Sequence, residues 1–205
     1  LRVDEIIILN SSHSNHPEMD FEKLSSDFDS WHISTPIAYG GGIMTNAQAK
    51  NIIKKGADRI VVSAKVLFNG EELARIGEVL GEQAIILHLP IAMHTSGLKV
   101  RDFEDSPLVS IIDMIPLNWG GEVLLSVVEN DGAKLPDWEV LRHLLQLLSD
   151  SRRVILSSGF SLSEDILAGL KLSQVQAVAI GNYLHRTELS VMLIKESVGL
   201  AVQVR

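Results

Sequence analysis

Cysteine is absent from all 205 residues, which excludes disulfides and thiolate chemistry and suits a reducing, cytoplasmic setting. Long apolar runs are absent too: the longest, such as Ile6 to Leu9 and Ala84 to Leu87, fall far short of the roughly 20 residues that span a bilayer. Positive charge is scarce, because 18 Lys and Arg stand against 26 Asp and Glu and leave a formal net charge of -8. We therefore expect no membrane segment, and no nucleic acid as the main partner, since neutralising a phosphate backbone needs clustered basic residues.

Apolar residues make up 46% of the chain and its length suits one domain, so we expect residues 1–205 to form a single domain. Short runs rich in Ile and Val alternate with longer amphipathic stretches, a pattern typical of βα units on a parallel sheet. Seven strands are predicted, at residues 5–9, 37–39, 60–63, 84–89, 123–127, 154–157 and 177–180. A parallel barrel normally closes with eight strands, so either a first strand precedes Leu1 or the barrel closes in an unusual way.

Helices are predicted where Leu and Ile recur at three- and four-residue spacing, over residues 47–55, 71–80, 138–148, 164–170 and 189–197. Thr45 or Asn46 is placed to cap the first of these helices. Ser161 and Glu164 have the spacing of a capping box at another helix start.

The segment Pro36 to Thr45, with the sequence PIAYGGGIMT, places three glycines between a short strand and a capped helix. Glycines let backbone N–H groups approach an anion, and the dipole of the following helix favours negative charge. This pattern predicts a phosphate site. The alternative is a tight βα turn that binds nothing.

Four segments carry a family resemblance, namely GGGI at 40–43, GADRIVVSAKVL at 56–67, GEQAII at 81–86 and GEVLLSVVENDG at 121–132. In order and spacing they resemble the cyclase subunit of imidazole glycerol phosphate synthase. The stretch NYLHRTELSV at 182–191 is most similar to the branch of this family found in surface-polysaccharide gene clusters and linked to sugar amidation. The resemblance runs from about Asp4 to the last residue. It implies an α/β fold, a TIM-type (β/α) barrel of the phosphate-binding kind, with the first βα unit missing from this sequence.

The resemblance also implies two phosphate sites at the C-terminal face of the barrel, which hold the two ends of a bisphosphate ribonucleotide. The first site would use Gly41, Gly42 and Ser63. The second would use Gly132, Ser158, Gly159, Gly181 and Asn182. Where the family has two glycines after the seventh strand, this chain has Ser158 and Gly159, and we expect the following Phe160 to narrow the turn.

The catalytic positions depart from the family pattern, which places Asp on the first and fifth strands as general acid and base for closing the imidazole ring. The first strand is not in this sequence, and the fifth-strand Asp aligns with Pro90. An Asp of the second strand aligns with Asn10. Neither side chain exchanges a proton near neutral pH. Of the acidic residues expected near the site, Glu129 and Asp131 remain, and Asp131 is the candidate catalytic residue; a turn-forming role beside Gly132 is the alternative.

A charged ring at the N-terminal face, through which ammonia from a glutaminase partner enters, is better matched. Glu5, Arg59 and Glu122 match three of its members, and the resemblance assigns them to an ammonia gate. Asp58 and Gln83 match positions that touch the glutaminase. The alternative is that these charges only stabilise the bottom of a barrel.

We expect no cofactor and no metal, because the seven histidines, among them His13, His16 and His94, show no HExxH-type spacing. The leading hypothesis is a subunit of a glutamine amidotransferase system that binds a phosphorylated sugar or ribonucleotide and uses ammonia from the glutaminase. One rival is a catalytically impaired paralogue that serves as a scaffold or ammonia conduit. Another is a plain aldose-phosphate isomerase relative on the same fold.

Overall fold

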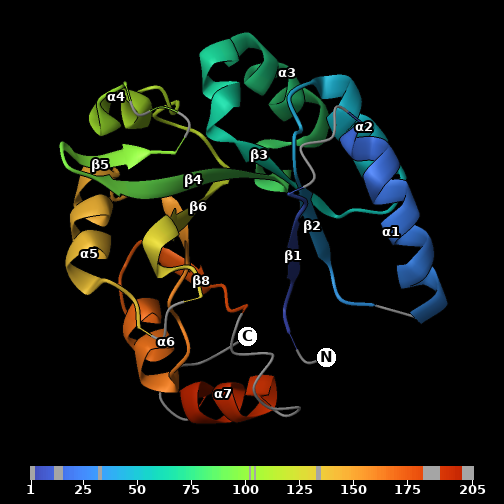
Figure 1. Ribbon diagram of the computed structural model, residues 1–205. Coiled ribbons are helices and arrows are strands. Elements are labelled where there is room, and N and C mark those ends of the chain that lie inside the picture. Colours follow the sequence, from blue (N-terminus) through green and yellow to red (C-terminus); the bar gives the residue numbers. More distant parts are fainter. Residues whose placement is uncertain are drawn as a thin grey trace. The chain divides into compact units, whose positions relative to one another are not determined.

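The computed structural model describes residues 3–11, 16–31, 34–101, 103, 105–132, 135–181 and 190–199, with only the backbone of 26–31 and 190. Parallel strands alternate with helices along the chain, which is the repeat of a TIM-type (β/α) barrel, as expected (Figure 1). The strands are β1 (Ile6–Leu9), β2 (Ile37–Gly40), β3 (Arg59–Ser63), β4 (Ile85–His94), β5 (Gly97–Val100), β6 (Glu122–Val127), β7 (Arg153–Ser157) and β8 (Val175–Val178). The helices are α1 (Pro17–Trp31), α2 (Asn46–Lys54), α3 (Gly70–Leu80), α4 (Leu108–Asp113), α5 (Trp138–Leu147), α6 (Ser163–Leu170) and α7 (Ser190–Gly199). Short 3-10 helices are η1 (Ala64–Asn69), η2 (Glu82–Ala84) and η3 (Val128–Asn130).

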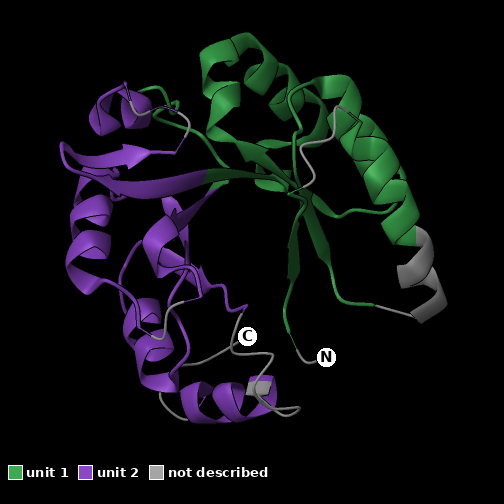
Figure 2. Ribbon diagram, in the orientation of Figure 1, with its two compact units in different colours: residues 1, 3–88, 114–122 green, residues 2, 89–113, 123–205 purple. Residues whose placement is uncertain are grey.

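Two compact units make up the chain (Figure 2). Unit 1 comprises residue 1, residues 3–88 and residues 114–122, and unit 2 comprises residue 2, residues 89–113 and residues 123–205. The strand order is β1-β2-β3-β4 in unit 1 and β4-β6-β7-β8 in unit 2. Strand β4 is named in both orders because its residues up to His88 belong to unit 1 and the rest belong to unit 2.

In unit 1, parallel pairing joins β1 to β2, β2 to β3 and β3 to β4. All four residues of β2 are buried, as in a parallel strand covered on both faces. Tyr39 of β2 packs against Phe21 of α1 with ring centroids 4.7 Å apart, so this face of the sheet is covered by helix.

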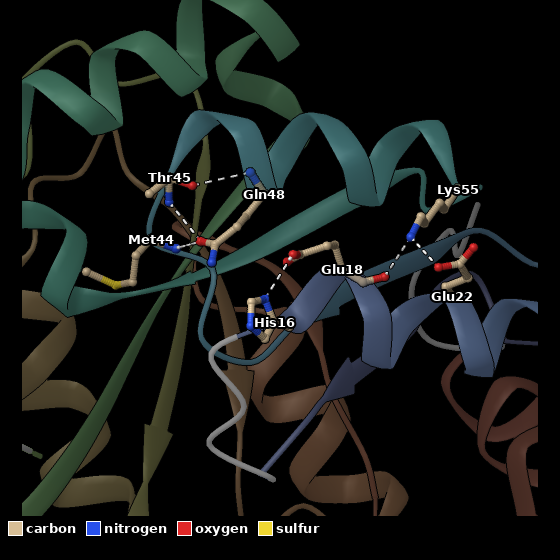
Figure 3. Close-up of polar contacts among 7 residues, drawn as sticks. All are labelled: His16, Glu18, Glu22, Met44, Thr45, Gln48 and Lys55. Atoms are coloured by element: carbon tan, nitrogen blue, oxygen red, sulfur yellow. Dashed lines mark hydrogen bonds and ion pairs between the residues drawn. The ribbon is translucent and has the colours of Figure 1, made fainter.

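The predicted cap of α2 is Thr45, whose hydroxyl accepts from the Gln48 N–H at 3.3 Å. The Gln48 side chain in turn accepts from the N–H groups of Met44 and Thr45, which completes a capping box (Figure 3). At the other end of this helix, Lys55 donates to the carbonyl of Glu18 and pairs with Glu22 at 2.7 Å. These contacts fix α2, and with it the exit of the glycine turn that precedes it, against α1.

Unit 2 contains a feature that the sequence analysis missed, an antiparallel hairpin. Strand β4 continues past Leu89 to His94, and β5 pairs back onto it from Gly97. Pro90 lies just beyond the stretch of β4 that pairs with β3, and its carbonyl accepts from Arg101 at 2.7 Å. A residue without an N–H is tolerated where the ladder changes partner.

The capping box predicted for Ser161 and Glu164 is wrong. The N-cap of α6 is Leu162, with no side-chain cap, and Ser161 is buried at 3% exposure. Because the helix begins at Ser163, Glu164 stands at the second helical position and not at the third, where a capping box needs it. Helices α1 and α4 were also not anticipated.

Candidate functional site

The sheet of unit 1 has two faces, and strand alternation assigns each residue to one of them. Tyr39 faces α1, so its neighbours on β2 face the other way. Ala38 pairs with Arg59, and Ser63, four residues further along β3, lies on the same face and pairs with His88 of β4. We call the face that carries Arg59, Ser63 and His88 the inner face.

Arg59 bridges two carboxylates at the start of the strands of unit 1. Its guanidinium donates to Glu5 at 3.1 Å and 3.4 Å and forms a second ion pair with Glu122. The three side chains are only 16–23% exposed. The structure therefore brings together the three residues assigned to the ammonia gate.

The electrostatics of this cluster are unbalanced, because two carboxylates share one cation. Burial raises the pKa of Glu5, and the neighbouring charge of Glu122 raises it further, while Arg59 opposes both. The Nε of Arg59 is buried and has no hydrogen-bond partner among the described residues. A partly buried charged cluster is costly to leave half-formed, and the buried Nε is one donor that the cluster itself does not use.

The residues assigned to contact a glutaminase, Asp58 and Gln83, lie at the same ends of the strands and are exposed. The carboxylate of Asp58 accepts from the Ile37 N–H at 2.8 Å, which ties the loop before β3 to the start of β2. Beside Gln83, Glu82 accepts from the Gly120 N–H at 2.6 Å, which ties η2, just before β4, to the segment before β6.

The first set of phosphate residues lies at the opposite, C-terminal ends of β2 and β3. Gly41 and Gly42 have φ of 133° and 78°, so the turn uses backbone conformations that favour glycine. A side chain at Gly41 would place its Cβ 2.5 Å from the Asn10 carbonyl oxygen. Ser63 accepts from the Lys65 N–H at 3.3 Å and keeps a hydroxyl proton to donate.

His88 was not anticipated as a site residue, although an isolated histidine in the apolar run IILHLP is a visible signal. It pairs with Ser63 across β3 and β4, at the C-terminal end of the inner face. Burial lowers the pKa of its imidazole to about 4, so the ring is neutral at physiological pH.

Asn10 lies on the helix-covered face of unit 1, and not on the inner face. Its amide donates to Asp20 of α1 at 2.9 Å and to the Tyr39 hydroxyl at 3.2 Å. A cleft of about 260 Å³ surrounds this group, lined by Ile8, Asn10, Asp20, Lys23, Leu24 and Tyr39. The structure thus gives Asn10 a packing and hydrogen-bonding role beside α1.

The acidic residues of unit 2 take different positions. Glu129 of η3 accepts from the Met93 N–H at 2.8 Å and so anchors the β4–β5 hairpin. Asp131, the candidate catalytic residue, follows η3, is exposed, and donates its backbone N–H to Val128 at 3.1 Å. It precedes Gly132, whose φ is 76°.

The second set of phosphate residues lies in unit 2. Ser158 and Gly159 have φ of 75° and 81°, and Ser158 is the one non-glycine residue with positive φ among those described. Ser158 therefore takes a glycine-like conformation where the family pattern has glycine. Gly181 is exposed after β8, and Asn182 lies outside the described residues.

Two neighbours of the second set change its expected shape. A Cβ at Gly159 would lie 2.5 Å from the Leu135 carbonyl oxygen, so the loop before α5 rests on this turn. Phe160 is 4% exposed and packs edge-on against Trp138 of α5 at 5.9 Å, since burial of its ring is favourable. Phe160 is therefore part of the core of unit 2. The expectation that its ring narrows the turn is wrong.

Two further kinds of feature, metal sites and membrane spans, depend on the side chains and helices of the described part of the chain. No group of three or more His, Asp or Glu side chains there is arranged to hold a metal ion. None of the described helices is long and apolar enough to cross a bilayer.

Comparison with known proteins identifies the family. The family model for the histidine biosynthesis protein matches residues 21–190. Similar proteins include the putative imidazole glycerol phosphate synthase subunit hisF2 of Campylobacter jejuni, 29% identical over 98% of this chain and 82% of the relative. A protein of the same name from Vibrio vulnificus is 25% identical over 94% of this chain and 72% of its own length. The imidazole glycerol phosphate synthase subunit HisF of Alkaliphilus metalliredigens is 25% identical over 95% of this chain and 79% of that protein. The chain therefore belongs to the histidine biosynthesis protein family, as a HisF-like member.

Proposed function

We propose that the chain is the HisF-like subunit of a cytoplasmic glutamine amidotransferase system, folded as one barrel domain over residues 1–205. It binds a phosphorylated sugar or ribonucleotide and uses ammonia from a glutaminase partner for amidation or cyclisation. The observation that carries the proposal is the bridge from Arg59 to Glu5 and Glu122. A fold needs no such cluster, since a partly buried ion-pair network is weak evidence for stability.

The two ends of the strands in unit 1 support a division of labour. The charged cluster and the exposed Asp58 and Gln83 stand at the N-terminal ends, where ammonia would enter. The glycine turn and Ser63 stand at the C-terminal ends, where backbone N–H groups would hold a phosphate. In (β/α) barrels the C-terminal face is the one that carries substrate.

Binding to a glutaminase tests the partner. The probe is a purified imidazole glycerol phosphate synthase glutaminase subunit, titrated into this chain in a calorimeter. We expect binding in the micromolar range or tighter, weakened about tenfold by Gln83→Ala and unaffected by Gln146→Ala, an exposed glutamine of α5. Absence of binding at tens of micromolar, with the protein folded, would reject this partner.

Ring closure is tested separately, with ammonium salt in place of the glutaminase. Each positioned acid or base typically contributes about 10² to 10⁴ in rate, and Pro90 has no proton to exchange. We therefore expect no imidazole glycerol phosphate from the unmodified chain. Ordinary cyclase turnover would refute this expectation. Turnover that appears only with Pro90→Asp would identify the missing acid. A chain that binds the glutaminase but stays silent in both forms would fit the scaffold or conduit role, and it would equally fit the lack of the first-strand Asp in this sequence.

A further inference from the structure

The inner face of unit 1 carries a histidine that the proposed function leaves without a role. His88 and Ser63 are direct cross-strand partners, so their side chains leave the sheet from the same face and from neighbouring strands. Ser63 is also the last residue of β3, and the glycine turn begins at the end of β2, the next strand. His88 is therefore adjacent to the candidate anion site.

We propose that His88 is a ligand of that site, and that its imidazole donates a hydrogen bond to the phosphate group of the substrate held by Gly41, Gly42 and Ser63. This inference rests on the proposed function, which places a phosphate there. Backbone N–H groups and one hydroxyl supply neutral donors only, and an imidazole adds a donor that can become cationic.

The surroundings of His88 suit this role. The charged side chains of the inner face of unit 1, Glu5, Arg59 and Glu122, stand at the other end of the strands. Burial is the cause of the lowered pKa of His88. Strand β2 carries no titratable side chain on the inner face, and Lys65, two residues beyond Ser63, is exposed. An arriving anion would add a negative charge beside the ring, and a nearby opposite charge favours the protonated imidazole.

Anion binding and protonation of His88 are therefore linked. If a bound dianion restores the pKa of His88 to its ordinary value near 6.5, the anion binds about tenfold more tightly at pH 5.5 than at pH 7.5. Sulfate is the appropriate probe, because its charge stays constant over this range, whereas phosphate itself titrates near neutrality.

The experiment is an NMR titration of sulfate at pH 7.5 and pH 5.5, following the amides of Gly41 and Gly42 and the imidazole of His88. We expect shifts of both glycine amide signals, a rise in the pKa of His88 on saturation, and a tenfold tighter binding of sulfate at pH 5.5. His88→Gln should keep the glycine shifts and lose most of this gain in affinity. His143→Gln, on the exposed side of α5, should lose neither.

The outcomes separate the two proposals. Glycine shifts with the same pH dependence in the unmodified chain and in His88→Gln would overturn the role of His88 and leave the anion site standing. No glycine shifts at tens of millimolar sulfate would overturn the anion site, and the inference with it. If His88→Gln does not fold, the pKa of His88 in the unmodified chain, measured with and without sulfate, decides the matter alone: an unchanged value would overturn the inference.

Discussion

The side-chain amide of Asn10 donates to the carboxylate of Asp20 at 2.9 Å, which joins the end of β1 to helix α1. The family pattern has an Asp at this position, and a second carboxylate here would face Asp20 without a proton between them. An amide therefore suits this contact better than a carboxylate would.

Asn10→Asp should destabilise the protein by about 1–3 kcal/mol at pH 7, because it replaces a donor by a like charge in a partly buried contact. Chemical denaturation measures this. The penalty should shrink as the pH falls toward about 4, because the like charge raises the pKa of one carboxyl of the pair and the folded protein then takes up a proton before the unfolded chain does. Asn51→Asp, at an exposed position of α2, is the control and should change little. A penalty that is the same at both pH values would contradict the like-charge explanation.

Gly41 and Gly56 can be compared directly, because they share one backbone feature and differ in their surroundings. Both have positive φ, at 133° and 107°, but only Gly41 is crowded, since a Cβ at Gly56 meets nothing within 4 Å. Gly56→Ala should cost about 1 kcal/mol from backbone strain alone. Gly41→Ala should cost about 2 kcal/mol more, because the backbone of Asn10 cannot move aside freely. Melting curves compare the two variants, and equal losses would show that the close approach to Asn10 is unimportant.

Ser158 is the reverse case of these glycines, because a serine here holds a positive φ that glycine adopts freely. Ser158→Gly should stabilise the protein by about 1 kcal/mol, because it removes the left-handed strain. Ser157→Gly, one residue earlier on β7, should instead destabilise by about 1 kcal/mol, since a glycine weakens a regular strand. Denaturant midpoints provide the measurement. If both substitutions destabilise, the hydroxyl of Ser158 makes a contact worth more than the strain.

The lowered pKa of His88 predicts how the free energy of unfolding depends on pH. The unfolded chain protonates a histidine near pH 6.5 and the folded chain does so near pH 4, so the unfolded state binds the extra proton between these values. Stability from this group is complete above about pH 6.5 and falls as the pH drops toward 4, by about 3 kcal/mol at most. His88→Gln should flatten this part of the profile, and His143→Gln should not. An unchanged slope in His88→Gln would assign the effect to other groups.

The parallel strands and several helices were predictable because their apolar periodicity is local. Each of the seven predicted strands is present within about two residues at its first residue, and Thr45 caps α2 as expected. Helix α1 was missed, because its apolar residues are few among many charges. Its start nevertheless carries two recognisable signals, Pro17 at the first helical position and acidic residues in the first turn.

The sequence by itself determined which residue types are available: no cysteine, a run of three glycines, and amide and proline at positions where the family pattern has carboxylates. Only the tertiary structure decided which of them meet. Strand register sets His88 beside Ser63 and Arg59 between Glu5 and Glu122, while it turns Asn10 toward α1. Register depends on pairing between residues 20 or more positions apart in the chain. A change of one residue in register would send every side chain to the other face.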